Sequence, residues 1–236
     1  MDDNELKQER EALEFIKKNQ KTLISNFCNN VIQIDNMPVS IFMAGSPGAG
    51  KTEYSKRLLK ELEQKGLSRA IRIDPDEVRA YIPGYNGKNA GLFQRGATLG
   101  VEKIHDYALL KKKNFLLDTT FSDYEKSRKN IIRSLDRGRL VTIQYLYQDA
   151  KVAWDFTKKR EEIEKRGIPV DFFINSLFSA KDNVNKIKEE FGNKLMLDLI
   201  IKDYTNNSIS TILNIEKIDN HLKMEYTKDE LKKILC

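Results

Sequence analysis

Eight consecutive residues of the chain match G-x-x-x-x-G-K-[ST], the pattern of a phosphate-binding loop. They are Gly45, Ser46, Pro47, Gly48, Ala49, Gly50, Lys51 and Thr52. Glycines in such a loop let backbone N–H groups converge on phosphate oxygens, and the N-terminus of the following helix adds partial positive charge. The lysine reaches the β- and γ-phosphates, and the threonine hydroxyl holds Mg²⁺. The sequence therefore predicts a site for a nucleoside triphosphate and Mg²⁺ at residues 45–52.

A second candidate group lies in the acidic segment that follows the short apolar stretch 70–73. Transfer of a phosphoryl group to a hydroxyl needs a carboxylate that positions the hydroxyl and accepts its proton. Asp76 is the candidate base, and Asp74 and Arg79 are candidates for organising metal or substrate. The spacing is equally compatible with a simpler role, in which Asp76 is a favourable acid in the first turn of a helix.

A third acidic position, Asp118, directly follows the apolar residues 115–117. An acid at the end of a buried strand is the usual contact for Mg²⁺ or its water in a P-loop protein. The alternative is a turn or helix-capping role. The nearby phosphate-binding loop favours the metal role.

Two arginines, Arg160 and Arg166, lie in the charged segment 158–167. A kinase needs basic groups over the phosphate being transferred, and a lid often supplies them. The alternative is a solvated helix face with i,i+4 pairs such as Glu162–Arg166. The segment taken alone favours the solvated face.

The elements that position these residues follow from apolar periodicity. Around the phosphate-binding loop, a strand is expected at 39–44 and a helix at 53–62. Further strands are expected at 70–74, 115–118, 140–147, 197–204 and 209–215, and helices at 76–81, 92–113, 123–136, 151–166, 169–190 and 229–235. This alternation predicts an α/β fold of the P-loop NTPase type, a parallel sheet with helices on both faces. The loop, Asp74 and Asp118 should then line one edge of the sheet.

Two terminal features complete the expected organisation. Residues 3–28 have the spacing of an amphipathic helical region, and Asn206-Asn207 is a candidate hairpin turn between the last two strands. We expect one P-loop kinase domain over residues 1–236, with a helical extension at about 1–30.

Composition narrows the class of protein. The 236 residues are 40% hydrophobic and 32% charged, which is typical of a globular protein. No apolar run approaches the roughly 20 residues that cross a membrane, and the acidic start is unlike a secretory signal. The two cysteines, Cys28 and Cys236, form no metal or redox motif, so a cytoplasmic setting is expected. The net charge of +6 suits anionic nucleotides as well as nucleic acid.

The order of these motifs resembles the zeta toxins, P-loop kinases of bacterial toxin–antitoxin systems. Besides the loop at 45–52, the segment 73–79 is similar to the family's I-D-x-D-x-x-[RK]. Val101-Glu102-Lys103 lies in the long predicted helix, and Leu117-Asp118-Thr119-Thr120 is similar to the family's E-G-T strand end. Arg166-Gly167-Ile168-Pro169 matches an R-x-x-P segment. The resemblance covers residues 39–170.

The resemblance implies a kinase that uses ATP or GTP with Mg²⁺ and phosphorylates the sugar 3′-hydroxyl of UDP-N-acetylglucosamine. An antitoxin protein is then an expected partner. By the resemblance, the base is Asp76, the phosphates are held by Lys51, Arg160 and Arg166, the metal by Thr52, and the substrate by Glu102 and Thr120.

The chain departs from the family pattern at three places, which bear on the acceptor. Ile82 stands where the family has His, Asp118 replaces a Glu, and the loop 84–91 is unlike the usual substrate loop. Two other kinase functions stay open, on polynucleotide 5′-hydroxyl ends or on another nucleotide metabolite such as NAD. We expect a nucleotide metabolite rather than nucleic acid, because no basic channel with stacking aromatics is evident. A nucleotide-gated binding module, which needs the loop but not Asp76, is the non-enzymatic alternative.

Overall fold

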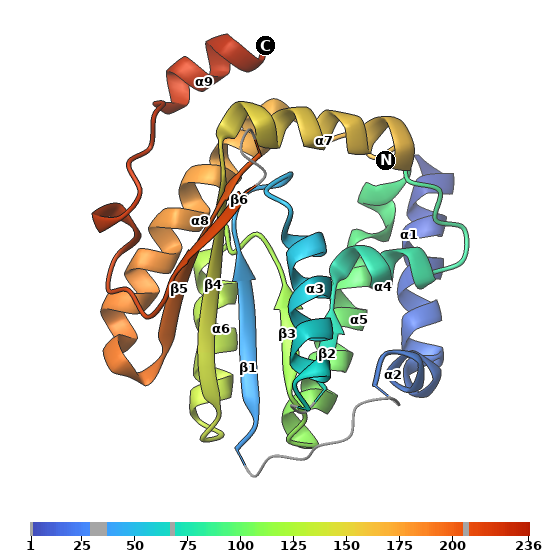
Figure 1. Cartoon of the computed structure of the whole chain (residues 1–236). Coiled ribbons are helices and arrows are strands. Elements are labelled where there is room, and N and C mark those ends of the chain that lie inside the picture. Colours follow the sequence, from blue (N-terminus) through green and yellow to red (C-terminus); the bar gives the residue numbers. More distant parts are fainter. Residues whose placement is uncertain (1, 29–36, 67–68, 205–207) are drawn as a thin grey trace.

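The computed structural model describes residues 2–28, 37–66, 69–204 and 208–236. Their strands form a single sheet in the order β2-β3-β1-β4-β5-β6, and Figure 1 shows β2, β3, β1, β4 and β5 side by side from right to left. The strands are β1 (Val39–Ala44), β2 (Ile71–Ile73), β3 (Phe115–Asp118), β4 (Leu140–Gln148), β5 (Met196–Asp203) and β6 (Ser208–Ile212). Neighbouring strands are parallel except β6, which pairs antiparallel with β5 at one edge.

The helices connect and cover these strands (Figure 1). They are α1 (Asp3–Lys18), α2 (Gln20–Cys28), α3 (Lys51–Gln64), α4 (Pro75–Tyr81), α5 (Ala90–Leu110), α6 (Tyr124–Leu135), α7 (Ala150–Glu164), α8 (Val170–Phe191) and α9 (Lys228–Leu235). Short 3₁₀ turns occur at Gly192–Lys194 and Ile218–Asn220.

Alternate residues of the central strands face opposite layers of the core, as the pleat of a strand requires. Ile41 and Met43 of β1 pack in one apolar cluster together with residues of α3. Phe42 and Ala44 of the same strand belong to the other main cluster, with residues of α5, α6 and α8. The predicted parallel sheet with helices on both faces is therefore confirmed, with β6 as an antiparallel edge strand.

The predicted N-terminal helical region is two helices that break at Asn19. The Asn19 side-chain amide donates to the carbonyl of Phe15 at 2.9 Å and so ends α1. Both helices pack on α5, where Gly96 and Gly100 permit the close approach. A Cβ on Gly96, for example, would lie 3.1 Å from the carbonyl oxygen of Ala12. This region therefore contributes to the main core. Residues 29 and 30 of the predicted extension lie outside the described residues.

The C-terminal part contains the predicted antiparallel strand pair. The candidate turn Asn206-Asn207 lies outside the described residues. The last strand ends at Ile212 rather than at 215, because Asn214 adopts a left-handed backbone with φ of 48° and donates its N–H to Asp198. Helix α9 follows and buries Leu231 against α7 and α8.

Within the described residues, no helix is long and apolar enough to cross a membrane.

Candidate functional site

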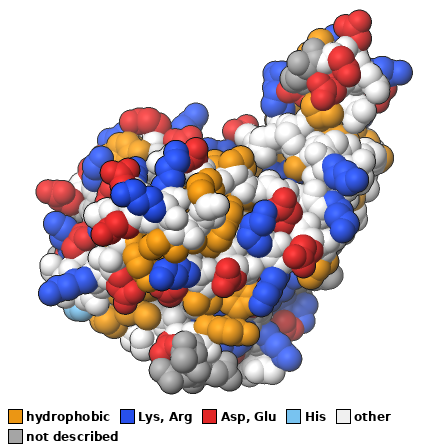
Figure 2. All heavy atoms as spheres, turned by 90° about the horizontal axis from the view of Figure 1, so that it is seen from above, with side chains coloured by type: hydrophobic (Ala, Val, Ile, Leu, Met, Phe, Trp, Pro, Cys, Tyr) orange, Lys and Arg blue, Asp and Glu red, His pale blue; other side chains and the backbone are white. Residues whose placement is uncertain are grey.

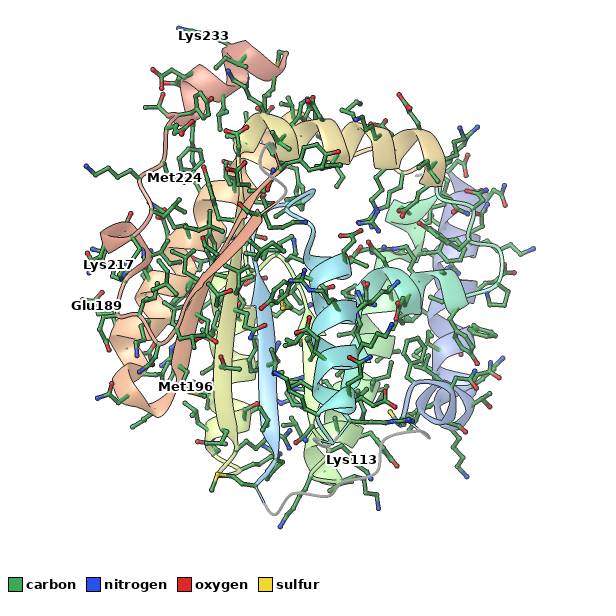
Figure 3. All side chains as sticks on the ribbon, in the orientation of Figure 1. Lys113, Glu189, Met196, Lys217, Met224 and Lys233 are labelled. Carbon is green, nitrogen blue, oxygen red and sulfur yellow. The ribbon has the colours of Figure 1, made fainter. Side chains whose placement is uncertain are left out.

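A cleft of roughly 1930 Å³ opens at the carboxyl ends of β1, β2 and β3. Because these strands are parallel, the phosphate-binding loop, Asp74 and Asp118 meet at one edge of the sheet, as predicted. Helix α7 crosses above this edge, and side chains of α7 and α4 point into the space beneath it (Figures 1 and 3). Lys113, the last of the lysine run 111–113, lies at the opposite end of the molecule (Figure 3).

The loop 45–52 connects β1 to α3 in the conformation that its glycines make possible. Gly45, Gly48 and Gly50 all have positive φ, of 138°, 71° and 83°. A Cβ on Gly48 would also overlap the carbonyl oxygen of Ala153, so α7 packs directly on the loop. The strand–loop–helix context of a P-loop is thus present at the predicted residues.

Lys51 is folded onto the loop itself. Its Nζ donates to the carbonyl oxygens of Gly45 at 2.9 Å and Ser46 at 2.7 Å. Burial lowers the pKa of Lys51, although the carboxylate of Asp118 opposes this effect. The ammonium therefore occupies the mouth of the loop, where phosphate oxygens of a ligand would accept the same hydrogen bonds.

Asp76 receives hydrogen bonds from three arginines. Arg79 Nη1 donates at 2.5 Å, Arg160 Nη2 at 2.9 Å, and Arg166 donates to the same oxygen as Arg79. Burial alone would raise the pKa of the Asp76 carboxyl, but the three guanidinium groups outweigh it and hold the pKa below its usual value. Asp76 is therefore a carboxylate, and 30% of its side chain is exposed to the cleft.

The two predicted lid arginines do more than form a solvated helix face, because both contact Asp76. Helix α7 ends at Glu164, and Lys165 takes a left-handed φ of 59°, which turns Arg166 out of the helix toward Asp76. Arg160 does form an i,i+4 pair with Glu164, but its other edge contacts Asp76. The structure thus brings both arginines to the candidate base, and their role in binding phosphate stays a prediction.

Asp74 and Arg79 hold the candidate base, Asp76, in position. Asp74 caps α4, because its Oδ1 accepts the backbone N–H of Asp76 at 2.8 Å. Arg79 is only 1% exposed and donates its second Nη group to Gln94 at 2.7 Å. These contacts fit the organising role that the sequence allowed, while direct contact with a substrate stays a prediction.

Arg72 is a site residue that sequence reasoning missed. Its guanidinium donates to Asp74 at 2.6 Å and to Asp118 at 2.8 Å, and it also contacts Glu77. Arg72 stands between Ile71 and Ile73, which are fully buried on the other face of β2. An arginine inside an apolar strand, two residues before an acid, is the local signal for such a residue, although it does not indicate the distant partners.

Ser55 connects the predicted metal residues Thr52 and Asp118, whose metal role stays a prediction. Ser55 Oγ lies 3.0 Å from the carbonyl oxygen of Thr52 and 3.4 Å from Asp118 Oδ2, which ties the start of α3 to the end of β3. Burial raises the pKa of Asp118, and the nearby charge of Asp74 raises it further. The positive charges of Lys51 and Arg72 oppose this rise. A hydroxyl and a carboxylate are the ligand types that Mg²⁺ takes alongside phosphate oxygens and water. The described residues hold no cluster of three or more His, Cys, Asp or Glu ligands, so phosphate and water oxygens would have to complete such a site.

The predicted acceptor residues line the same cleft. Glu102 is exposed on α5, and the Thr120 hydroxyl lies 2.8 Å from that of Ser122. The next residue, Phe121, is buried at a left-handed φ of 63°, which is strained for a side chain of this size. Asn183 of α8 holds this strained turn by donating to the carbonyls of Phe121 and Ser122.

The sheet order, the loop geometry and the cleft define a P-loop α/β protein with a kinase-like fold. The model of the Zeta toxin family matches residues 27–217, and the chain therefore belongs to this family. No curated protein sequence matches the chain.

Solved structures share the fold at low sequence identity. A chain of the PezAT chromosomal toxin–antitoxin system of Streptococcus pneumoniae is 17% identical with a TM-score of 0.66, and the match covers 99% of this chain and 88% of that one. A chain of AvrRxo1-ORF1:AvrRxo1-ORF2 with sulphate ions is 11% identical with a TM-score of 0.63, over 91% and 71% of the two chains. The corresponding complex with ATP is 13% identical with a TM-score of 0.59, over 98% and 70%.

Proposed function

We propose that this protein is a small-molecule kinase that transfers the γ-phosphoryl group of ATP or GTP to a hydroxyl of a nucleotide sugar such as UDP-N-acetylglucosamine. The observation that carries the proposal is the pairing, in one cleft, of a P-loop with an ionised carboxylate that three arginines surround. Membership of the Zeta toxin family supports it.

The donor phosphates bind at the loop. Backbone N–H groups of residues 45–52 and the ammonium of Lys51 contact the phosphate oxygens. Lys51 then donates to these oxygens in place of the carbonyls of Gly45 and Ser46. Thr52 and Asp118 would hold Mg²⁺, which would supply positive charge against the phosphates. Arg72 keeps the Asp118 carboxylate in place at the strand end.

Asp76 orients the acceptor hydroxyl and accepts its proton. In the free protein its low pKa makes it a weak base. When Arg160 and Arg166 turn to the phosphates, Asp76 loses two of its three positive neighbours, and its pKa rises toward the ordinary value. Phosphate binding therefore activates the base in the same step in which it neutralises the transferring group.

The acceptor binds on the α5 side of the cleft. Buried polar groups of a sugar need hydrogen-bond partners, because unpaired ones are costly. Glu102 and Thr120 supply such partners, while Asp74 and Arg79 hold Asp76 in position beneath them. Because a chain of the PezAT toxin–antitoxin system shares this fold, we further propose that an antitoxin protein binds this chain.

The test is consumption of ATP or GTP, with mass analysis of products, across nucleotide sugars, NAD and 5′-hydroxyl oligonucleotides. We expect a phosphorylated nucleotide sugar with wild type and with the exposed-lysine control Lys60→Ala, and none with Lys51→Ala. Phosphorylation of the oligonucleotides alone would reject the acceptor and favour a polynucleotide kinase. Tight binding of ATP with no transfer to any acceptor would favour the nucleotide-gated binding module.

A further inference from the structure

We propose that Phe156 and Tyr204 form the site for the base of the donor nucleotide, with Lys202 as an additional phosphate-binding cation between these rings and the P-loop. This inference rests on the proposed function, because it assumes a nucleotide donor. It adds the residues that bind the base and the kind of base they accept.

The two rings meet at the end of the cleft where the P-loop lies. Phe156 lies on α7 and Tyr204 directly follows β5, and their ring centroids are 4.9 Å apart at an interplanar angle of 82°. Both rings line the cleft, and Tyr204 is 61% exposed. An edge-to-face pair leaves aromatic surface open to a third ring, and a planar base supplies such a ring.

The topology explains why these rings lie beside the P-loop. Strand β4 is the parallel neighbour of both β1, which leads into the loop, and β5, which leads to Tyr204. Helix α7 begins two residues after β4 ends and packs on the loop at Gly48, so it carries Phe156 over the same edge. Strand ends of parallel sheets are where ligands bind in this class of fold.

Lys202 connects the rings to the phosphate site. A Cβ on Gly50 would overlap Lys202 Nζ, so the ammonium lies directly against the backbone of the loop. Among the described residues, no carboxylate is paired with this ammonium. Tyr204 is two residues further on, about 7 Å along an extended chain. The order along the cleft is therefore loop, cation and aromatic rings, which matches the order of phosphates, ribose and base in a nucleotide.

The hydrophobic side chains on this side of the molecule are otherwise interrupted by charge. Seen from above, the face that carries α7 shows apolar side chains scattered between basic and acidic ones (Figure 2).

Stacking on an aromatic ring depends on the π-face of a base and not on its hydrogen-bonding edge. We therefore expect this site to accept adenine and guanine with similar affinity.

The experiment compares ligands with and without a base. Dissociation constants of ATP, GTP and inorganic tripolyphosphate, each with Mg²⁺, are measured by calorimetry on the full chain. We expect Tyr204→Ala and Phe156→Ala to weaken ATP and GTP binding about tenfold, which is 1.4 kcal/mol, and to leave tripolyphosphate unchanged. Lys202→Ala should weaken all three, and Tyr204→Phe should restore wild-type binding.

The control is Leu110→Ala, since Leu110 is a large apolar residue, 76% exposed, at the end of α5 and outside the lining of the cleft. Thermal unfolding of each variant shows that the fold is kept. Wild-type affinity for ATP in both alanine variants would overturn the base site, and so would equal wild-type affinity for ATP and tripolyphosphate; neither result touches the kinase proposal. A wild-type protein that binds none of the three ligands would instead overturn the proposed function and the base site with it.

Discussion

Replacing Asp76 by Asn tests the central feature of the cleft, one carboxylate shared by three arginines. The substitution keeps the shape of the side chain and removes both its charge and its ability to accept a proton. A positioned general base contributes typically about 10²- to 10⁴-fold to a reaction rate. We expect kcat to fall by this factor.

The affinity for ATP should change in the opposite direction. In the free protein Arg160 and Arg166 must leave Asp76 before they can bind phosphate. The side chains of Arg160 and Arg166 are 46% and 26% exposed, and ion pairs near the surface contribute about 0.2–1 kcal/mol each. In Asp76→Asn neither pair has to be broken. ATP should therefore bind tighter by about 0.4–2 kcal/mol, roughly 2- to 30-fold.

Two measurements check this pair of expectations. Calorimetry with ATP and Mg²⁺ gives the affinity without an acceptor, and product formation with the acceptor from the panel gives kcat. Asp155→Asn, an exposed aspartate on α7, is the matched control. A kcat within about threefold of wild type would refute the base assignment. An ATP affinity weakened tenfold or more would show that Asp76 belongs to the donor site, and the arginine argument would be wrong.

Three further substitutions probe the other charges of the cleft. Lys51→Ala should weaken ATP binding and abolish transfer while the melting temperature stays near wild type; turnover within twofold of wild type would remove the P-loop from the mechanism. Arg72→Met leaves the buried carboxylates Asp74 and Asp118 without their cation, so urea unfolding should show a loss of about 3–5 kcal/mol, and a loss below about 1 kcal/mol would contradict the contacts. Burial, together with repulsion from nearby arginines, lowers the pKa of His105 from 6.5 to about 3. Between these two pH values the unfolded chain binds a proton that the folded chain does not, so the free energy of unfolding falls as pH falls, by up to about 1.4 kcal/mol per pH unit. His105→Phe should flatten this slope in urea titrations at several pH values, with exposed His221→Gln as the matched control; an unchanged slope in His105→Phe would show that His105 is not responsible.

Local sequence signals predicted the frame of the site well. The apolar run of β1, the glycines of the loop and the helical spacing of α3 are adjacent in the chain, so each reinforces the others. The parallel arrangement then places Asp74 and Asp118 beside the loop without any knowledge of side-chain contacts. Element ends shifted by a few residues, as at Asn214, where a left-handed residue ends the last strand early.

The contacts between distant segments were not predictable in the same way. Arg160 and Arg166 lie 84 and 90 residues from Asp76, and within their own segment they follow the pattern of a solvated helix. A single left-handed residue, Lys165, turns Arg166 out of that pattern, and lysine carries no special preference for this conformation. Arg72 was missed because its partners come from β3, α3 and α4, which a reading along the chain cannot bring together.

The free protein gives Lys51, Arg72, Arg160 and Arg166 hydrogen-bond partners of its own, and this determines what kind of ligand can bind. Lys51 donates to loop carbonyls, Arg72 to Asp74 and Asp118, and Arg160 and Arg166 to Asp76. Binding is therefore an exchange of partners, and a ligand gains only the difference between its own contacts and those it replaces. A singly charged anion offers Arg160 and Arg166 no more than the carboxylate of Asp76, which they already contact. A triphosphate presents several charges at once and can engage Lys51 and both arginines together, so the internal pairing itself favours a polyphosphate over smaller anions.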